Sequence, residues 1–205
     1  ALEALRGLPV DRRPRWVTTV HGLNSPSRYS AIMASGERVI CVSRTVRDYV
    51  CHHYPQTRRE TLRVIPRGID PGDFPRSAHP DRAARASVAA QFPALSGDGP
   101  LLLLPGRGTR LKGHADALAL LAALRAAGMD ARLWMPGARE AGRERYLAEL
   151  EREAAAHGIA DAVAITPSTS AIARAYAASD LVLQLSRKPE AFGRTVLEAL
   201  SVGRP

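Results

Sequence analysis

Two glutamates eight positions apart, Glu190 and Glu198, are suited to bind a ligand rich in hydroxyl groups, because an ionised carboxylate accepts hydrogen bonds and donates none. Between them lie Gly193, Arg194 and Thr195. If a helix begins at these residues, its unpaired backbone N–H groups and the positive end of its dipole favour a phosphate. Phosphate with hydroxyls on both sides describes a nucleotide-sugar, and the segment therefore indicates a site for such a ligand.

The elements expected around this segment are a strand, an acidic loop and a helix. The apolar run 180–185 predicts a buried strand, and 186–190 is a polar loop that contains a proline. Apolar residues then recur after Gly193 at positions 196, 197, 200 and 202, which predicts a helix that ends at Gly203. The first glutamate accordingly belongs to the loop, and the second lies about one turn into the helix.

A glycine-rich basic loop, 105–114, follows the apolar strand expected over 101–104. Ligands of parallel α/β sheets bind at the carboxyl ends of the strands, which is where this loop must lie. Arg107 can donate forked hydrogen bonds to phosphate oxygens, and Lys112 adds a mobile point charge. The spacing matches neither a Walker A motif nor a G-x-G-x-x-G motif.

The acidic segment resembles the donor-binding signature of retaining glycosyltransferases of the two-Rossmann-domain (GT-B) type, in particular glycosyltransferase family 4. The resemblance implies that Glu190 contacts the transferred sugar and that Glu198 holds the ribose of the nucleotide. It also implies that the backbone of Gly193, Arg194 and Thr195 lies near the donor diphosphate.

Other positions extend this resemblance over nearly the whole chain. Arg107 and Lys112 are similar to the family's Gly-Arg and Lys-Gly positions, which implies that they hold the diphosphate in place of a divalent metal. No metal and no cofactor are therefore expected. His21 ends the strand expected over 15–20, and the resemblance implies a contact with the transferred sugar. Arg67 stands where the family usually has asparagine.

The order of expected elements predicts an α/β protein of the GT-B type, with two Rossmann-like parallel-sheet domains that are both incomplete. Residues 1–70 are the C-terminal portion of the acceptor-side domain, 71–99 an interdomain segment rich in turns, and 100–205 the donor-binding domain, truncated at its C-terminus. Such a fragment is expected to turn over little or no substrate by itself.

Some polar residues are assigned structural roles rather than chemical ones. Ser168, Thr169 and Ser170 precede a helix expected over 171–178, and residues of this kind commonly cap helices. Three glutamates on the helix expected over 144–157 are assigned to a solvated face: Glu149, Glu151 and Glu153.

The net charge of +9 comes almost entirely from arginines, since Lys112 and Lys188 are the only lysines. Such charge suits phosphate-bearing ligands, an anionic membrane surface or nucleic acid. Aromatic residues make up only 5% and do not alternate with a basic patch, so nucleic acid is not expected. Phosphate ligands together with a compositional preference for arginine account for the charge.

Cys41 and Cys51 lie ten positions apart without a C-x-x-C spacing, which indicates structural thiols in a reduced, cytoplasmic protein. His52 and His53 have no further ligands at metal-binding spacing. No apolar run is long enough to span a membrane. Peripheral association with the anionic inner face of the inner membrane is a further expectation.

The resemblance implies sugar transfer from a nucleotide-diphosphate sugar to an acceptor, with retention of the anomeric configuration. The expected acceptor is a cell-envelope glycan or glycolipid, as in polysaccharide or lipopolysaccharide biosynthesis. Two alternatives stay open: a nucleotide-sugar-binding module without catalysis, and a GT-B-fold epimerase that acts on the nucleotide-sugar with no acceptor.

Overall fold

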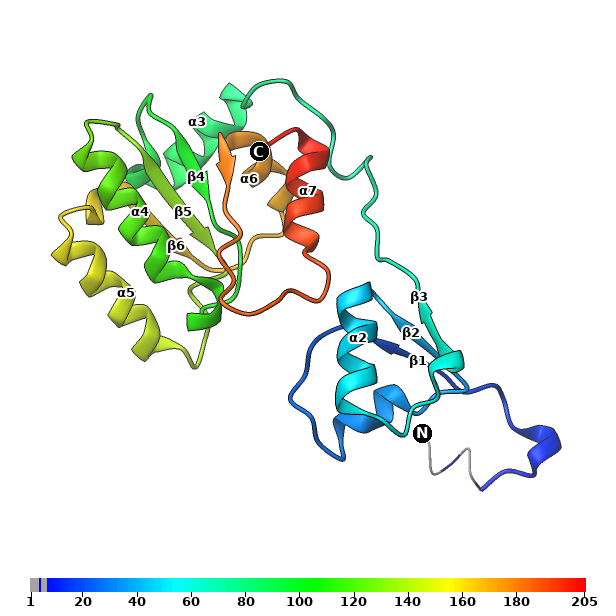
Figure 1. Cartoon of the computed structure of the whole chain (residues 1–205). Coiled ribbons are helices and arrows are strands. Elements are labelled where there is room, and N and C mark those ends of the chain that lie inside the picture. The colour runs from blue at the N-terminus through cyan, green and yellow to red at the C-terminus, as the bar shows by residue number, and fades with distance from the viewer. Residues whose placement is uncertain (1–3, 5–6) are drawn as a thin grey trace. The chain divides into compact units, whose positions relative to one another are not determined.

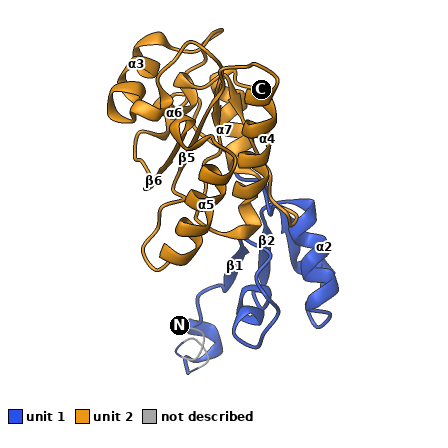
Figure 2. Cartoon of the chain, turned by 90° about the vertical axis from the view of Figure 1, so that its left-hand side faces the viewer, with its two compact units in different colours: residues 1–67, 190–192 blue, residues 68–189, 193–205 orange. Residues whose placement is uncertain are grey.

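A computed structural model describes residue 4 and residues 7–205. The chain divides into two compact units, which Figure 2 shows in different colours. Unit 1 comprises residues 1–67 and the short segment 190–192, and unit 2 comprises residues 68–189 and 193–205. Each unit is described by itself.

Unit 1 contains a parallel three-stranded sheet in the order β1-β2-β3 (Figure 1). Over residues 7–67 its strands are β1 (Val17–Val20), β2 (Arg38–Cys41) and β3 (Leu62–Val64). The helices of this range are α2 (Arg44–His53) and the 3₁₀ turns η1 (Val10–Arg12), η2 (Ser30–Ala34) and η3 (Arg59–Thr61). Helix α2 begins where the Ser43 hydroxyl accepts a hydrogen bond from the Val46 N–H at 3.1 Å. This side-chain cap replaces a partner that the first turn of a helix lacks.

Unit 2 contains a parallel four-stranded sheet in the order β6-β5-β4-β7. The strands are β4 (Leu101–Leu103), β5 (Arg132–Pro136), β6 (Val163–Thr166) and β7 (Leu181–Val182). The helices are α3 (Arg82–Gln91), α4 (His114–Ala126), α5 (Glu144–Ala156), α6 (Ile172–Ala178) and α7 (Arg194–Val202), with the 3₁₀ turns η4 (Pro93–Leu95), η5 (Arg110–Lys112) and η6 (Ala160–Ala162). The predicted α/β class with parallel sheets is confirmed.

Both faces of the unit 2 sheet are covered, because alternate side chains of each strand point to opposite sides. Leu102 and Leu133 pack under α4 and α5 in one core. Leu101, Leu103 and Trp134 pack in a second core with residues of α3, α6 and α7. Burial on both faces explains why these strands are largely apolar, which made them recognisable in the sequence.

The strand expected over 180–185 is shorter than predicted and ends at Val182. Beyond Leu183 the chain leaves β4 and turns to the loop before α4, where the Arg187 N–H donates to the Leu111 carbonyl at 2.9 Å. Backbone hydrogen bonds that would have extended the strand are replaced by this loop-to-loop contact.

The expectation that Ser168, Thr169 and Ser170 cap the next helix is wrong. Ala171 is the N-cap residue of α6, and no side chain caps this helix. The Thr169 hydroxyl instead accepts a hydrogen bond from the Ala171 N–H at 3.0 Å, within the turn that precedes the helix. The hydroxyls of Ser168 and Ser170, on either side, make no hydrogen bond within the part of the chain that the structure describes.

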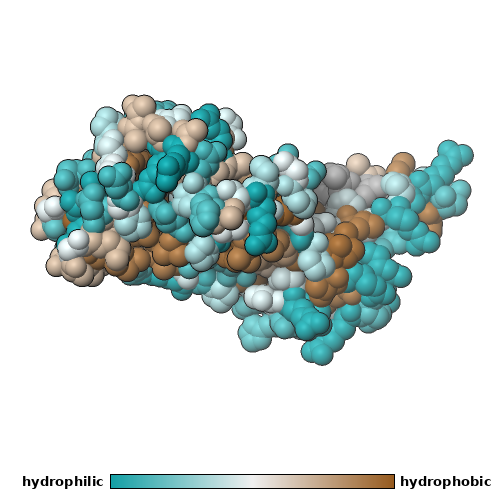
Figure 3. Space-filling model, turned by 90° about the horizontal axis from the view of Figure 1, so that it is seen from above, coloured by the Kyte–Doolittle hydropathy of each residue, from teal (hydrophilic) through white to brown (hydrophobic). Residues whose placement is uncertain are grey.

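Hydrophilic residues cover much of the face seen in Figure 3, and apolar residues show between them. Exposed apolar side chains include Val196 and Leu200 on α7. Among the described residues, no helix has the length and apolar character that crossing a bilayer requires.

Candidate functional site

The carboxyl ends of β4, β5 and β6 lie at one edge of the unit 2 sheet, and the loops that follow them enclose a cavity of about 420 Å³. Arg107 lines it from the loop after β4, Arg139 and Glu140 from the loop after β5, and Thr169 from the loop after β6. Parallel α/β sheets bind ligands at this edge. The cavity therefore has the position expected of a ligand site, and Arg107 gives it a cation.

Glycines allow the first two loops to approach backbone to backbone. A Cβ on Gly108 would overlap the carbonyl oxygen of Ala138. Gly137 has φ +87°, and a Cβ there would lie 3.0 Å from the carbonyl oxygen of Gly106. Gly106 and Gly137 line the cavity, and because neither has a side chain, a bound anion could approach their main chain closely.

Lys112 lies beside the same loop. A Cβ on Gly106 would be 3.5 Å from the Cγ and Cδ atoms of Lys112, so the lysine stem passes over this glycine. Gly106 is the immediate neighbour of Arg107 in the chain. The stem of Lys112 therefore packs beside the residue that precedes Arg107 within this loop.

The segment before Glu190 holds this basic loop in place. Gly113 has φ +74°, and a Cβ there would overlap the Leu185 carbonyl oxygen. The Arg187 guanidinium donates two hydrogen bonds to Asp116 in the first turn of α4, at 2.9 and 2.6 Å. These hydrogen bonds lower the pKa of Asp116. The loops after β4 and β7 are thereby linked through both main chain and side chains.

His114, directly after this glycine, was not singled out in the sequence. It is fully buried, and its Nδ1 lies 3.4 Å from the Tyr146 hydroxyl. Its Nε2 has no hydrogen-bond partner within the described part of the chain. Burial lowers the pKa of His114, which favours the neutral imidazole at the start of α4. Nothing in the local sequence, in which His114 follows Lys112 and Gly113, predicts that this side chain is buried.

Glu198 lies on the inner side of α7 and is only 7% exposed. Its Oε2 accepts a hydrogen bond from the Tyr176 hydroxyl at 2.8 Å, and its Oε1 accepts two from the Arg194 guanidinium at 3.1 and 2.8 Å. A carboxylate offers about four lone-pair positions, so these three bonds leave room for about one more donor. The structure thus brings Glu198 and Arg194 together.

Tyr176 of α6 is the residue of this group that sequence reasoning missed. It is 1% exposed, and burial followed by its hydrogen bond to Glu198 raises the pKa of its hydroxyl, which keeps the donor protonated. An alanine-rich helix with one tyrosine gives no hint of this role, because the partner lies 22 positions away.

Helix α7 buries its acid and exposes two of its large apolar side chains. Val196 is 41% and Leu200 58% exposed, whereas Glu198 is buried. The helix begins at Arg194, and its N-cap residue is Gly193, which has φ +82° and supplies no side-chain cap. The N–H groups in the first turn of a helix have no acceptor within the helix. In α7 the N–H groups of Arg194 and Thr195 lie in this first turn. This start keeps the amide donors that an anion would need.

His21 and Glu190 belong to unit 1, whereas Arg107, Lys112 and Glu198 belong to unit 2. His21 is exposed and directly follows the last residue of β1. Glu190 is half-buried, and the two residues after it, Ala191 and Phe192, pack against the core of unit 1. Among the residues that the structure describes, no group of three His, Cys, Asp or Glu side chains is placed to hold a metal ion.

Comparison with family models places this geometry in a known class. Residues 89–205 match the model of glycosyl transferases group 1, and residues 1–73 match that of glycosyltransferase family 4. The first match covers more than half of the chain. The chain therefore belongs to the family of glycosyl transferases group 1.

Solved structures show the same fold. A glycosyltransferase from Rickettsia africae ESF-5 is 24% identical with a TM-score of 0.75, over 92% of this chain and 49% of that chain. HepE from Anabaena, in complex with UDP and glucose, is 22% identical with a TM-score of 0.79, over 94% and 52%. WaaG, a glycosyltransferase involved in lipopolysaccharide biosynthesis, is 22% identical with a TM-score of 0.64, over 82% and 43%.

The chain thus spans about half the length of the solved structures that it matches. No curated protein matches the sequence significantly.

Proposed function

We propose that this chain provides the donor-binding part of a glycosyltransferase that moves a sugar from a nucleotide-diphosphate sugar to an acceptor. The observation that carries the proposal is a cavity at the carboxyl edge of the unit 2 sheet, lined by Arg107, in a chain that belongs to the glycosyl transferases group 1. The binding of UDP and UDP-glucose by HepE supports a nucleotide-sugar as the donor.

In this proposal the donor diphosphate is held by cations and main-chain amides. Arg107 and Lys112 meet the phosphates from the loop after β4. From the N-terminus of α7, after the N-cap Gly193, the backbone N–H groups of Arg194 and Thr195 donate hydrogen bonds to the phosphates. Fixed positive charge stabilises the nucleotide diphosphate as it leaves, so that this step requires no metal ion or cofactor.

Glu198 accepts the ribose hydroxyls of the nucleotide. Tyr176 fixes the orientation of the carboxylate through Oε2, and Arg194 occupies Oε1. The Arg194 side chain is half exposed, and it can therefore turn from Oε1 to a phosphate when the donor arrives. That exchange frees an acceptor for ribose and adds a cation to the diphosphate at the same time.

Glu190 and His21 contact the transferred sugar, and the Glu190 carboxylate supports the positive charge that develops at its ring. Transfer proceeds with retention of configuration, and no covalent step is assigned to Glu190. The acceptor is a cell-envelope glycan or glycolipid, which the likeness in fold to WaaG supports. The protein acts in the cytoplasm and at the inner face of the inner membrane.

The nucleotide part of this proposal is tested by calorimetric titration of the chain with UDP-, GDP- and ADP-sugars. We expect saturable binding to one base. Glu198→Gln keeps the side-chain volume and one carbonyl oxygen as an acceptor. It removes the negative charge and the second acceptor oxygen, which the ribose hydroxyls and Arg194 would otherwise use. It should weaken binding about tenfold, as the loss of a hydrogen bond to a charged group predicts.

Glu60→Gln, on an exposed residue of unit 1, is the matched control and should leave donor binding unchanged. Thermal unfolding of each variant shows whether it remains folded. Absence of binding to all three nucleotide-sugars, or equal affinity of wild type and Glu198→Gln, would contradict the proposal. Binding that is followed by isomerised sugar would favour the epimerase alternative.

A further inference from the structure

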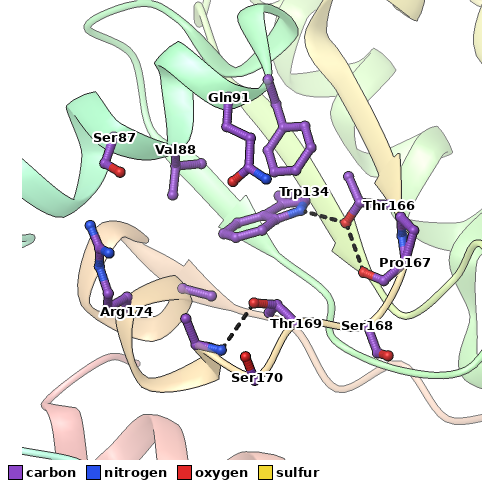
Figure 4. A pocket seen from close by; sticks show the side chains of 13 residues that line it. Ser87, Val88, Gln91, Trp134, Thr166, Pro167, Ser168, Thr169, Ser170 and Arg174 are labelled. Atoms are coloured by element: carbon purple, nitrogen blue, oxygen red, sulfur yellow. Dashed lines mark hydrogen bonds between the residues drawn. The ribbon is translucent and has the colours of Figure 1, made fainter.

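A second cavity, of about 370 Å³, lies in unit 2 between α3, α6 and the loop that follows β6 (Figure 4). Its volume falls within the range of about 300–1,000 Å³ that small-molecule sites occupy. None of the residues assigned above to the donor phosphates or ribose lines it. It shares only Ser168 and Thr169 with the cavity that contains Arg107, so one loop forms a wall of both.

The floor of this second cavity is apolar. Val88 of α3, Trp134 of β5 and Ala175 of α6 are buried and line it. Phe92 packs on Trp134 with ring centroids 5.6 Å apart. The indole N–H donates to the Thr166 hydroxyl at 3.0 Å, so its hydrogen bond is satisfied within the protein. The floor can therefore take the C–H surface of a ligand without leaving a polar group unpaired.

Polar side chains surround this floor: Ser87, Gln91, Ser170 and Arg174. None of them has a side-chain hydrogen bond or ion pair with the residues that the structure describes. In Figure 4 the side chain of Gln91 points from α3 toward the Trp134 indole, and Arg174 stands on the α6 side of the hollow. Ser170, no longer expected as a cap, is thus grouped with a second hydroxyl, an amide and a guanidinium around one apolar floor.

The donor and acceptor types define the ligand chemistry. Hydroxyl and amide groups both donate and accept, as the hydroxyls of a sugar require. Arg174 is the one cation among the lining residues, and the lining holds no carboxylate. A guanidinium makes forked hydrogen bonds to phosphate or carboxylate. The positive charge and the hydrogen-bonding groups of the lining therefore favour a ligand with a hydroxylated ring and one anionic group.

We propose that this cavity is a second carbohydrate site, which binds a sugar unit bearing one phosphate or carboxylate. The ring rests on the accessible surface of Val88 and Trp134, the anionic group pairs with Arg174, and Ser87, Gln91 and Ser170 meet the hydroxyls. The site is separate from the donor site and goes beyond the proposed transfer reaction.

The test uses the two tryptophan indole signals in a ¹H–¹⁵N NMR spectrum of the full chain. Trp134 lines the cavity, Trp16 lies in unit 1, and Trp16→Phe assigns the two signals. Glucose 6-phosphate and glucuronic acid are titrated separately, with glucose and inorganic phosphate as comparisons. We expect saturable shifts of the Trp134 signal with one of the two anionic sugars, and at least about tenfold weaker binding of the neutral sugar and of phosphate alone.

Arg174→Gln should weaken the binding of the anionic sugar about tenfold and leave nucleotide binding unchanged. Arg107→Gln should weaken nucleotide binding and leave the binding of the anionic sugar unchanged. The two variants separate failure of this proposal from failure of the donor assignment. Three outcomes would overturn the proposal: no saturable shift of the Trp134 signal, equal affinity for phosphate and sugar phosphate, or unchanged affinity in Arg174→Gln. A response to glucose 6-phosphate alone identifies a phosphate ligand, and a response to glucuronic acid alone identifies a carboxylate.

Discussion

Glu198 is a charged side chain held on the buried side of a helix, and its three hydrogen bonds explain how. Burying an ionised carboxylate is costly unless hydrogen bonds compensate. Arg194, one turn earlier on α7, supplies charge and two donors, and Tyr176 supplies a third donor from α6. The three hydrogen bonds fix the orientation of the carboxylate, which suits the contact with ribose that is proposed for it.

Tyr176→Phe tests the role of this tyrosine. Removing the hydroxyl takes one donor from a buried carboxylate, so we expect a loss of about 1.5–3 kcal/mol in the free energy of unfolding, measured with urea. Nucleotide binding should weaken as well, because the carboxylate is no longer fixed. Tyr146→Phe is the matched control. Its hydroxyl contact with His114 is longer, at 3.4 Å, and its effect on stability should be smaller.

The pH dependence of stability gives a readout that packing alone would not change. Burial raises the pKa of Tyr176 above the ordinary value of 10.0, so the unfolded chain loses this proton first as the pH rises. Stability should therefore fall as the pH increases above about 10. Part of that fall should disappear in Tyr176→Phe, and an unchanged slope would contradict the assignment.

At the scale of elements, the basic loop 105–114 depends on close backbone contacts with its neighbours. Gly108 meets the loop after β5, and Gly113 meets the segment after β7. Two hydrogen bonds between Arg187 and Asp116 add a surface ion pair, which contributes at most about 1 kcal/mol. Main-chain packing therefore contributes more to the position of this loop than the ion pair between Arg187 and Asp116 does.

Gly113→Ala tests this dependence. The alanine must take φ +74° and its Cβ meets the Leu185 carbonyl, so strain and overlap add, and we expect a loss of about 2–4 kcal/mol in stability together with weaker nucleotide binding. Gly128→Ala is the matched control, because Gly128 has φ +85° but open space around it, and about 1 kcal/mol is expected there. Equal losses in urea unfolding would show that the contact with Leu185 is unimportant.

At the scale of the whole molecule, the chain carries a net charge of +9 that two proposed phosphate-binding cations do not account for. Many of the other arginines form surface ion pairs, such as Arg47 with Asp48 and Arg139 with Glu151. An excess of positive charge nevertheless remains over the protein. It favours anionic partners at long range and at low ionic strength.

This charge is the reason to expect peripheral membrane binding, and co-sedimentation with lipid vesicles measures that binding. Vesicles that contain phosphatidylglycerol should retain the protein at low salt, and binding should fall several-fold as ionic strength rises and screening shortens the range of attraction. Vesicles of phosphatidylcholine alone are the control and should retain little. Binding that does not depend on lipid charge or salt would exclude an electrostatic association.

The sequence by itself determined the parallel α/β class, because strands buried on both faces are largely apolar and the apolar residues of helices recur with a period of 3.6 residues. It also determined which residues are candidates for chemistry, since Glu190, Glu198, Arg107 and Lys112 stand in motifs of local spacing. The tertiary structure alone decided which side chains hold the candidates: Tyr176 for Glu198, and the Leu185 segment for the basic loop. These partners lie tens of residues away along the chain, and local periodicity carries no information about contacts of that range.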